Sequence, residues 1–153
     1  MTQTIQKQKY QAYAAATQTV AKTRQIVMLY DGIIRFVQLA KEAIKERRIE
    51  DRYRLLIKAS EIIMGLQSCL DFEQGGQVAK VLYNFYSTVD GRIFSIHRTN
   101  SLASCDEVIA DLKQMRDVWN EIDIGSEATP AEAPAAASPP SSSGPDQTII
   151  LSA

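Results

Sequence analysis

The sequence of 153 residues predicts an all-α protein, an antiparallel up-down four-helix bundle with an N-terminal cap segment and a disordered C-terminal tail. Three observations support this fold class. Apolar side chains recur at helical spacing through four stretches. The breaks between these stretches are short, so consecutive helices must run antiparallel. All five prolines follow Gly125. We therefore expect a cap segment at residues 1–22, the bundle at 23–124 and the tail at 125–153.

The first bundle helix, expected from about Thr23 to Arg48, has an unusually broad apolar face. At about 100° per residue its polar side chains fall in one narrow strip, which leaves an apolar arc of about 240°. A core-facing stripe needs only about 100° or a little more. The surplus indicates that something besides the core covers this helix. The polar strip consists of Asp31, Arg35, Gln38, Glu42 and Glu46.

The second helix, expected from about Asp51 to Asp71, has a core face and a small outer stripe. Ile57 and Met64 project opposite the core face and form the outer stripe. The glycine pair Gly75 and Gly76 then predicts a helix-breaking link. The expected core face of this helix consists of Leu55, Ala59, Ile62, Ile63, Leu66, Cys69 and Leu70.

The third helix also has apolar side chains outside its core face, namely Tyr83 and Phe94, with Tyr86 at the border. Three helices with surplus apolar surface predict a groove for an amphipathic helix or an extended segment. The expected core positions of the third helix are Val78, Leu82, Phe85, Val89, Ile93 and Ile96. Those of the fourth helix are Val108, Ile109, Leu112, Met115, Trp119 and Ile122.

Apolar residues at the two ends of the chain leave alternatives open. Tyr10 and Tyr13 are three residues apart, ahead of a polar link. They could lie across the bundle as a removable lid, or belong to a short helix that extends the core. Near the other end, Ile149–Leu151 could dock weakly on an exposed groove, although a frayed end is favoured.

Composition and charge argue against several classes of protein. The formal net charge is −1 with both signs interspersed, so we expect no nucleic-acid partner. No apolar run approaches the roughly 20 residues of a membrane span, which predicts a cytoplasmic protein without membrane insertion. His97 is the only histidine, so a His-rich metal site is excluded and a catalytic triad has little support. We expect no enzyme, no cofactor and no metal.

Five stretches resemble the flagellar secretion chaperones of the FliS family. They are "YQAY", "RQIVMLYDGIIRFVQLAKEAI", "LLIKASEIIMGLQSCLD", "VAKVLYNFY" and "VIADLKQMRDVW". The resemblance spans about Tyr10 to Trp119. It implies a cytosolic four-helix bundle that binds the C-terminal segment of newly made flagellin, keeps it from polymerising and delivers it to the flagellar type III export apparatus. A helical adaptor or phosphotransfer bundle with another partner is the alternative.

The resemblance also implies roles for particular residues. Tyr10 and Tyr13 match a segment that caps the bundle and contributes to docking at the cytosolic domain of the export gate. Where the family commonly has a small-residue and proline turn before the first helix, this chain has "AKTR". For the cargo-free chain, a monomer and a homodimer are both compatible with the sequence. The expected partner-binding residues are Tyr10, Tyr13, Ile26, Leu29, Tyr30, Gly32, Ile57, Met64, Tyr83, Tyr86 and Phe94.

Overall fold

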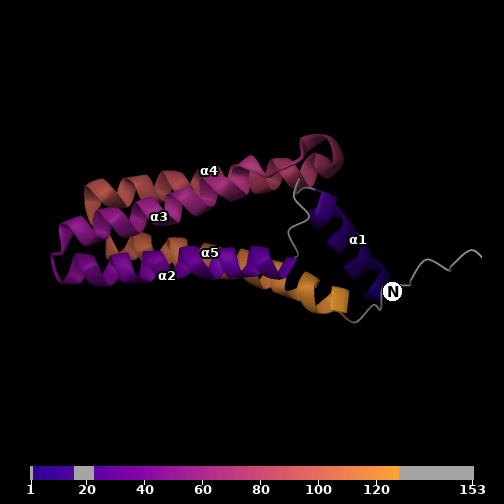
Figure 1. Cartoon of the computed structure of the whole chain (residues 1–153), viewed down its shortest axis with the longest axis horizontal. Helices are drawn as coiled ribbons and strands as arrows, with labels where there is room; N and C mark the ends of the chain where they lie inside the picture. Colours follow the sequence, from indigo (N-terminus) through magenta and orange to yellow (C-terminus); the bar gives the residue numbers. More distant parts are fainter. Residues whose placement is uncertain (1, 16–22, 128–153) are drawn as a thin grey trace, which may run out of the picture.

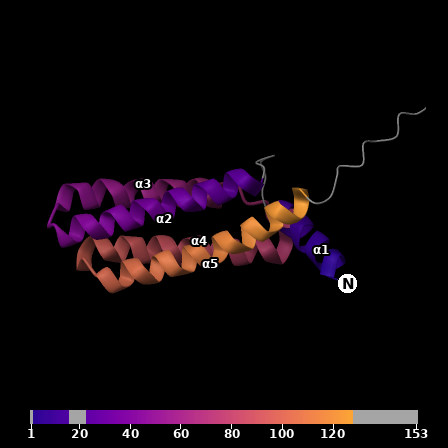
Figure 2. The ribbon, with the colours of Figure 1, turned by 90° about the horizontal axis from the view of Figure 1, so that it is seen from below.

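A computed structural model describes residues 2–15 and 23–127, which form a helical bundle with one further helix across its end (Figure 1). The helices are α1 (Thr2–Ala15), α2 (Thr23–Lys45), α3 (Ile49–Ser68), α4 (Phe72–Thr99) and α5 (Leu102–Glu127). Helices α2 to α5 run alternately up and down, as a second view also shows (Figure 2). The predicted all-α four-helix bundle is thus confirmed. The predicted tail lies outside the described residues, except that α5 continues to Glu127.

The turn between α2 and α3 consists of residues 46–48 and begins earlier than predicted. Helix α2 ends at Lys45 because Arg47 adopts a positive φ of 59°. The Arg48 N–H then donates to the Ala43 carbonyl at 2.8 Å, and the Arg47 N–H donates to the Ile44 carbonyl at 3.1 Å. These two hydrogen bonds satisfy carbonyl groups that have no partner within the helix at its C-terminal end. The first helix is consequently three residues shorter than its expected end at Arg48.

The start of α4 corrects the predicted glycine link. Asp71 caps the helix, because its side chain accepts hydrogen bonds from the Glu73 and Gln74 N–H groups at 3.0 Å each. This cap satisfies two otherwise open donors and starts the helix at Phe72. Gly76 instead lies inside α4, where φ 49° and ψ −122° produce a kink. The glycine breaks helical geometry as expected, at a kink that joins the short first segment of α4 to the rest of the helix.

The turn between α4 and α5 is held by a buried arginine of α3. Asn100 has a left-handed φ of 52°, and its N–H donates to the Ile96 carbonyl at 2.9 Å. The Arg52 guanidinium donates to the Asn100 side-chain carbonyl, and only 8% of Arg52 is exposed. Here a cation also benefits from the negative end of the α4 dipole. Arg52 therefore joins α3 to the turn that follows α4.

The broad apolar face of α2 is covered largely by its neighbours within the bundle. Helix α2 packs extensively against both α3 and α5, so two flanks of its surface are buried. The expectation that something besides the core covers the whole surplus is therefore too broad. Some apolar surface does stay exposed, at Met28, Leu29 and Leu39. The buried residues of α2 are Thr23, Ile26, Tyr30, Ile33, Ile34, Val37, Ala40 and Ala43.

The core face of α3 is rotated slightly from the predicted one. Leu56 is fully buried, whereas Leu55 and Ile62 are only partly buried. A Cβ on Gly32 of α2 would lie 3.6 Å from the Ile62 Cδ1, which places Ile62 on the flank of α3 towards α2. The same rotation leaves Ile57 partly buried and Met64 exposed.

No helix in the described ranges is long and apolar enough to cross a membrane.

Candidate functional site

Helix α1 lies across the end of the bundle where α4 begins and α5 ends (Figures 1 and 2). Its Tyr13 ring meets the Trp119 ring of α5 edge-on, with centroids 4.8 Å apart and planes at 88°. Burial raises the pKa of the Tyr13 hydroxyl. Tyr13 thus packs on the bundle, as both the removable lid and the core-extending helix require. Tyr10 lies in α1, but its side chain falls outside the described residues.

Two buried tyrosines join α2 to α4 beneath this end. The Tyr30 hydroxyl donates to the Tyr86 hydroxyl at 2.9 Å, and the two residues are 0% and 2% exposed. The Phe85 ring lies 6.5 Å from Tyr30 and 5.8 Å from Tyr86, between ring centroids. Because each hydroxyl has a partner inside the bundle, burial of these rings leaves little polar surface unsatisfied.

This placement corrects three of the expected partner-binding residues. Ile26, Tyr30 and Tyr86 are core side chains, so they offer a partner almost no surface while the bundle is closed. Tyr86 was expected at the border of its helix face. Its hydroxyl reaches Tyr30 across the core instead, which holds the ring inside. Any effect of these residues on a partner would therefore act through the packing of the bundle.

The buried tyrosine pair predicts a loss of stability at alkaline pH. Burial raises the pKa of Tyr86 to about 12, opposed by the hydrogen bond from Tyr30. Burial, together with the neighbouring Tyr86, also raises the pKa of Tyr30 well above its ordinary value. A raised folded-state pKa means that the folded protein holds the proton more tightly than the unfolded chain does. The stability from Tyr86 is therefore complete below pH 10 and is lost between pH 10 and about 12.

We expect this loss to amount to about 3 kcal/mol for Tyr86 alone, from 1.36 kcal/mol per pKa unit. Urea unfolding followed by circular dichroism between pH 8 and pH 12 would measure it. In Tyr86→Phe the free energy of unfolding should fall less steeply over this range, and Tyr53→Phe, which removes an exposed hydroxyl, is the control. An equal slope in Tyr86→Phe and the unmodified protein would contradict the prediction.

A row of apolar side chains follows the outer seam between α3 and α4, and we call it the α3/α4 strip. It consists of Tyr53, Ile57 and Met64 on α3 with Tyr83 and Phe94 on α4. Three contacts fix the register of these helices. The Gln67 amide donates to the Tyr83 carbonyl at 3.3 Å and to the Ser87 hydroxyl at 2.8 Å. Near the other end, the Tyr53 ring lies 5.3 Å from the His97 ring.

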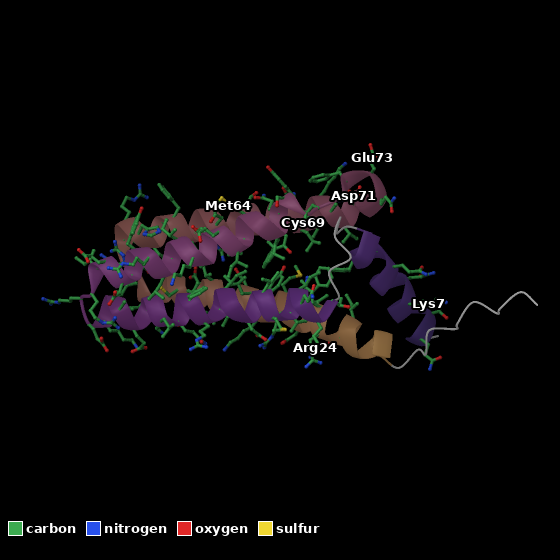
Figure 3. The ribbon with its side chains drawn as sticks, in the orientation of Figure 1. Lys7, Arg24, Met64, Cys69, Asp71 and Glu73 are labelled. Atoms are coloured by element: carbon green, nitrogen blue, oxygen red, sulfur yellow. The ribbon has the colours of Figure 1, made fainter. Side chains whose placement is uncertain are left out.

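The strip is exposed, with 52% of Met64, 45% of Tyr83 and 74% of Phe94 accessible to solvent. Figure 3 labels Met64 on α3, on the outside of the bundle. Phe72 adjoins the strip, since its ring centroid is 5.8 Å from that of Tyr83. The register of the two helices places Ile57, Met64, Tyr83 and Phe94 along the same seam. Large exposed apolar patches mark sites of interaction with proteins or membranes.

The remaining expected residues lie elsewhere, and the strip contains members that sequence reasoning missed. Leu29, which is 41% exposed, and Gly32 belong to α2 and not to the α3/α4 seam. Tyr53 was missed although it lies one turn before Ile57 on the same helix face. Phe72 was missed because it was assigned to a link between helices, whereas it begins α4.

The single histidine is only partly exposed, which disfavours the phosphotransfer alternative. His97 is partly buried, and its Nδ1 is buried without a hydrogen-bond partner. Burial and the charge of Arg52 lower its pKa. Tyr53 also covers one side of the ring. Within residues 2–15 and 23–127, no group of three or more His, Cys, Asp or Glu side chains is placed to hold a metal ion.

Comparison with known proteins identifies the family. Residues 5–126 match the family described as Flagellar protein FliS. A Flagellar secretion chaperone FliS from Campylobacter jejuni is 31% identical over 74% of this chain and 89% of its own. One from Vibrio cholerae is 31% identical over 63% of this chain and 71% of its own. One from Escherichia coli is 26% identical over 72% of this chain and 86% of its own. The match extends from α1 to the last turn of α5, and the chain therefore belongs to the FliS family of flagellar proteins.

Proposed function

We propose that this protein is a cytosolic flagellar secretion chaperone. It binds the C-terminal segment of flagellin, prevents premature polymerisation and delivers flagellin to the flagellar type III export apparatus. Family membership and the names of the relatives support the flagellar export role. The observation that carries the binding role is the exposed α3/α4 strip, which suits an amphipathic segment.

The strip has dimensions that suit a helical segment of a partner. Tyr53 and Met64 are 11 residues apart on α3, or about 16 Å at 1.5 Å per residue. That length corresponds to about three turns of a docked helix. A partner with apolar residues at i, i+3, i+4 and i+7 could place them along the seam. Ile57, which is only partly buried, would form the floor between the two exposed ends.

The proposed mechanism requires binding alone and no covalent reaction. A free flagellin terminus has an apolar stripe that otherwise pairs with other subunits, and bound chaperone masks it. Masking lowers the population of flagellin that is competent to associate, by mass action. A segment that folds on binding is held with modest affinity for its contact area, which suits a cargo that must be released. In this proposal α1 acts as a displaceable lid, and Tyr10 and Tyr13 contribute to docking at the export gate.

The decisive experiment is to mix the purified protein with purified flagellin. The proposal predicts a soluble complex of fixed stoichiometry, which size-exclusion chromatography with light scattering would detect. The same measurement on the free protein would reveal a homodimer. If flagellin and this protein elute separately at micromolar concentration, and flagellin polymerises at an unchanged rate, the chaperone proposal fails and the helical adaptor with another partner is favoured.

Substitutions in the strip should weaken binding while leaving the fold intact. We expect Met64→Glu combined with Phe94→Ser to reduce affinity for the flagellin C-terminal segment at least about tenfold, or about 1.4 kcal/mol. Both side chains are more than half exposed, so stability should change by no more than about 0.5 kcal/mol per site. Isothermal titration calorimetry would measure the affinity.

The matched control is Leu39→Ser, which removes an exposed apolar side chain from α2, away from the strip. It should bind the flagellin segment as well as the unmodified protein does. Equal weakening by Leu39→Ser and by the double substitution would show that the strip is not the binding surface.

A further inference from the structure

Three exposed apolar side chains gather at one end of the strip, and we call them the terminal patch. They are Phe72, Tyr83 and Met64, which are 47%, 45% and 52% exposed. The Phe72 and Tyr83 rings are in contact. Met64 lies one turn before Gln67, whose amide binds the backbone carbonyl of Tyr83. The described residues leave about half of each side chain open to water.

The terminal patch lies at the end of the bundle from which the rest of the chain departs. Helices α4 and α5 are antiparallel, so Glu127 and Phe72 lie at the same end (Figures 1 and 2). Residues 128–148, a stretch of 21 residues, separate Glu127 from Ile149. A chain of this length has a root-mean-square end-to-end distance of about 25 Å. Two packed helices are together about 20 Å wide, so Ile149 can reach the patch.

The sequence beyond α5 contains one apolar segment suited to this surface. From Gly125 onwards the only large apolar residues are Ile149, Ile150 and Leu151. They follow a stretch dominated by alanine, serine and proline. The family match ends at residue 126, so this segment lies outside the matched residues.

We propose that Ile149–Leu151 docks on the terminal patch of its own chain. A short linker gives such a segment an effective concentration in the millimolar range. Even a contact with millimolar affinity would then be occupied about half of the time. A partner that needs the same patch would bind with an apparent affinity lowered by about twofold to threefold. The segment would thus act as a weak intramolecular competitor, and its docking stands independently of which partner the strip receives.

Methionine oxidation tests this proposal on the full chain. Peroxide converts an accessible thioether to the sulfoxide, and docking would shield Met64. We expect Met64 to be oxidised about two to three times faster in a variant with Ile149→Ser, Ile150→Ser and Leu151→Ser than in the unmodified protein. Mass spectrometry of proteolytic peptides would measure the rate. The ratio should not depend on protein concentration, because the contact is intramolecular.

Met28 is the internal control. It is 64% exposed and lies near the start of α2, at the same end of the bundle but on a helix other than α3 and α4. Its oxidation rate should be the same in both proteins. Equal Met64 rates in the two proteins would overturn the proposal. So would a protection of Met64 that grows with protein concentration, because a second copy would then be the occupant.

Discussion

Ile63→Ala should lower the free energy of unfolding by about 2–5 kcal/mol. Ile63 is 0% exposed and lies on the core face of α3 with Leu56 and Ala59. Removing its outer carbons leaves a cavity that rigid neighbouring helices can fill only in part. Urea denaturation followed by circular dichroism would give the difference, with the slope of the transition unchanged.

The matched control is the next residue, Met64→Ala, which should change stability by no more than about 0.5 kcal/mol. Met64 is 52% exposed, so the two substitutions compare the inner and outer faces of one helix. Ile62→Ala should fall between them, because Ile62 is partly buried on the flank towards α2. If Met64→Ala were as destabilising as Ile63→Ala, the orientation of α3 would be wrong.

Tyr13→Ala should release α1 from the end of the bundle. The substitution removes an aromatic contact worth about 0.5–1.5 kcal/mol beyond the burial of the ring itself. Trp119 is the only tryptophan and meets Tyr13 edge-on, so its fluorescence reports directly on this contact. We expect its emission to shift to longer wavelength. If α1 is a lid, affinity for the flagellin C-terminal segment should stay equal or rise, because opening no longer opposes binding.

Tyr53→Ala is the control for this experiment, because it removes an exposed tyrosine near the N-terminal end of α3, at the end of the bundle away from α1. It should leave the emission of Trp119 unchanged. Amide exchange supplies the direct measurement of lid movement. Backbone amides of residues 8–15 should be partly protected in the free protein and become exposed when flagellin binds. Protection that stays the same or increases in the complex would identify Tyr13 as a core residue or a cargo clamp.

The fold could be predicted because local signals agree along most of the chain. Val108, Leu112, Trp119 and Ile122 were assigned to the core of the last helix from spacing alone, and all are buried. Boundaries were harder, because two local signals can compete. At the start of α4 the glycine pair suggested a break, whereas Asp71 already caps the helix at Phe72. The Asp71 side chain sets the start of the helix, and Gly76 then kinks it one turn later.

The candidate site was only partly predictable for a different reason. Met64, Tyr83 and Phe94 were recognised because exposure follows from the position of a residue on its own helix. Tyr30 and Tyr86 share the core spacing of their helices, but local spacing does not show that their hydroxyls meet across 56 positions of sequence. The polar hydroxyl that favours the surface in one context favours the core once a partner is present.

The position of α2 between α3 and α5 also determines when this protein can finish folding during its synthesis. The Asp31 carboxylate of α2 accepts a hydrogen bond from Arg116 of α5 at 2.8 Å, across 85 positions of sequence. Until α5 leaves the ribosome, the side of α2 that α5 will cover stays exposed. From Lys45 to Glu127 the ribosome adds 82 residues, which takes about 4–16 s at 5–20 residues per second. The nascent chain thus exposes a broad apolar surface for seconds before α5 can cover it.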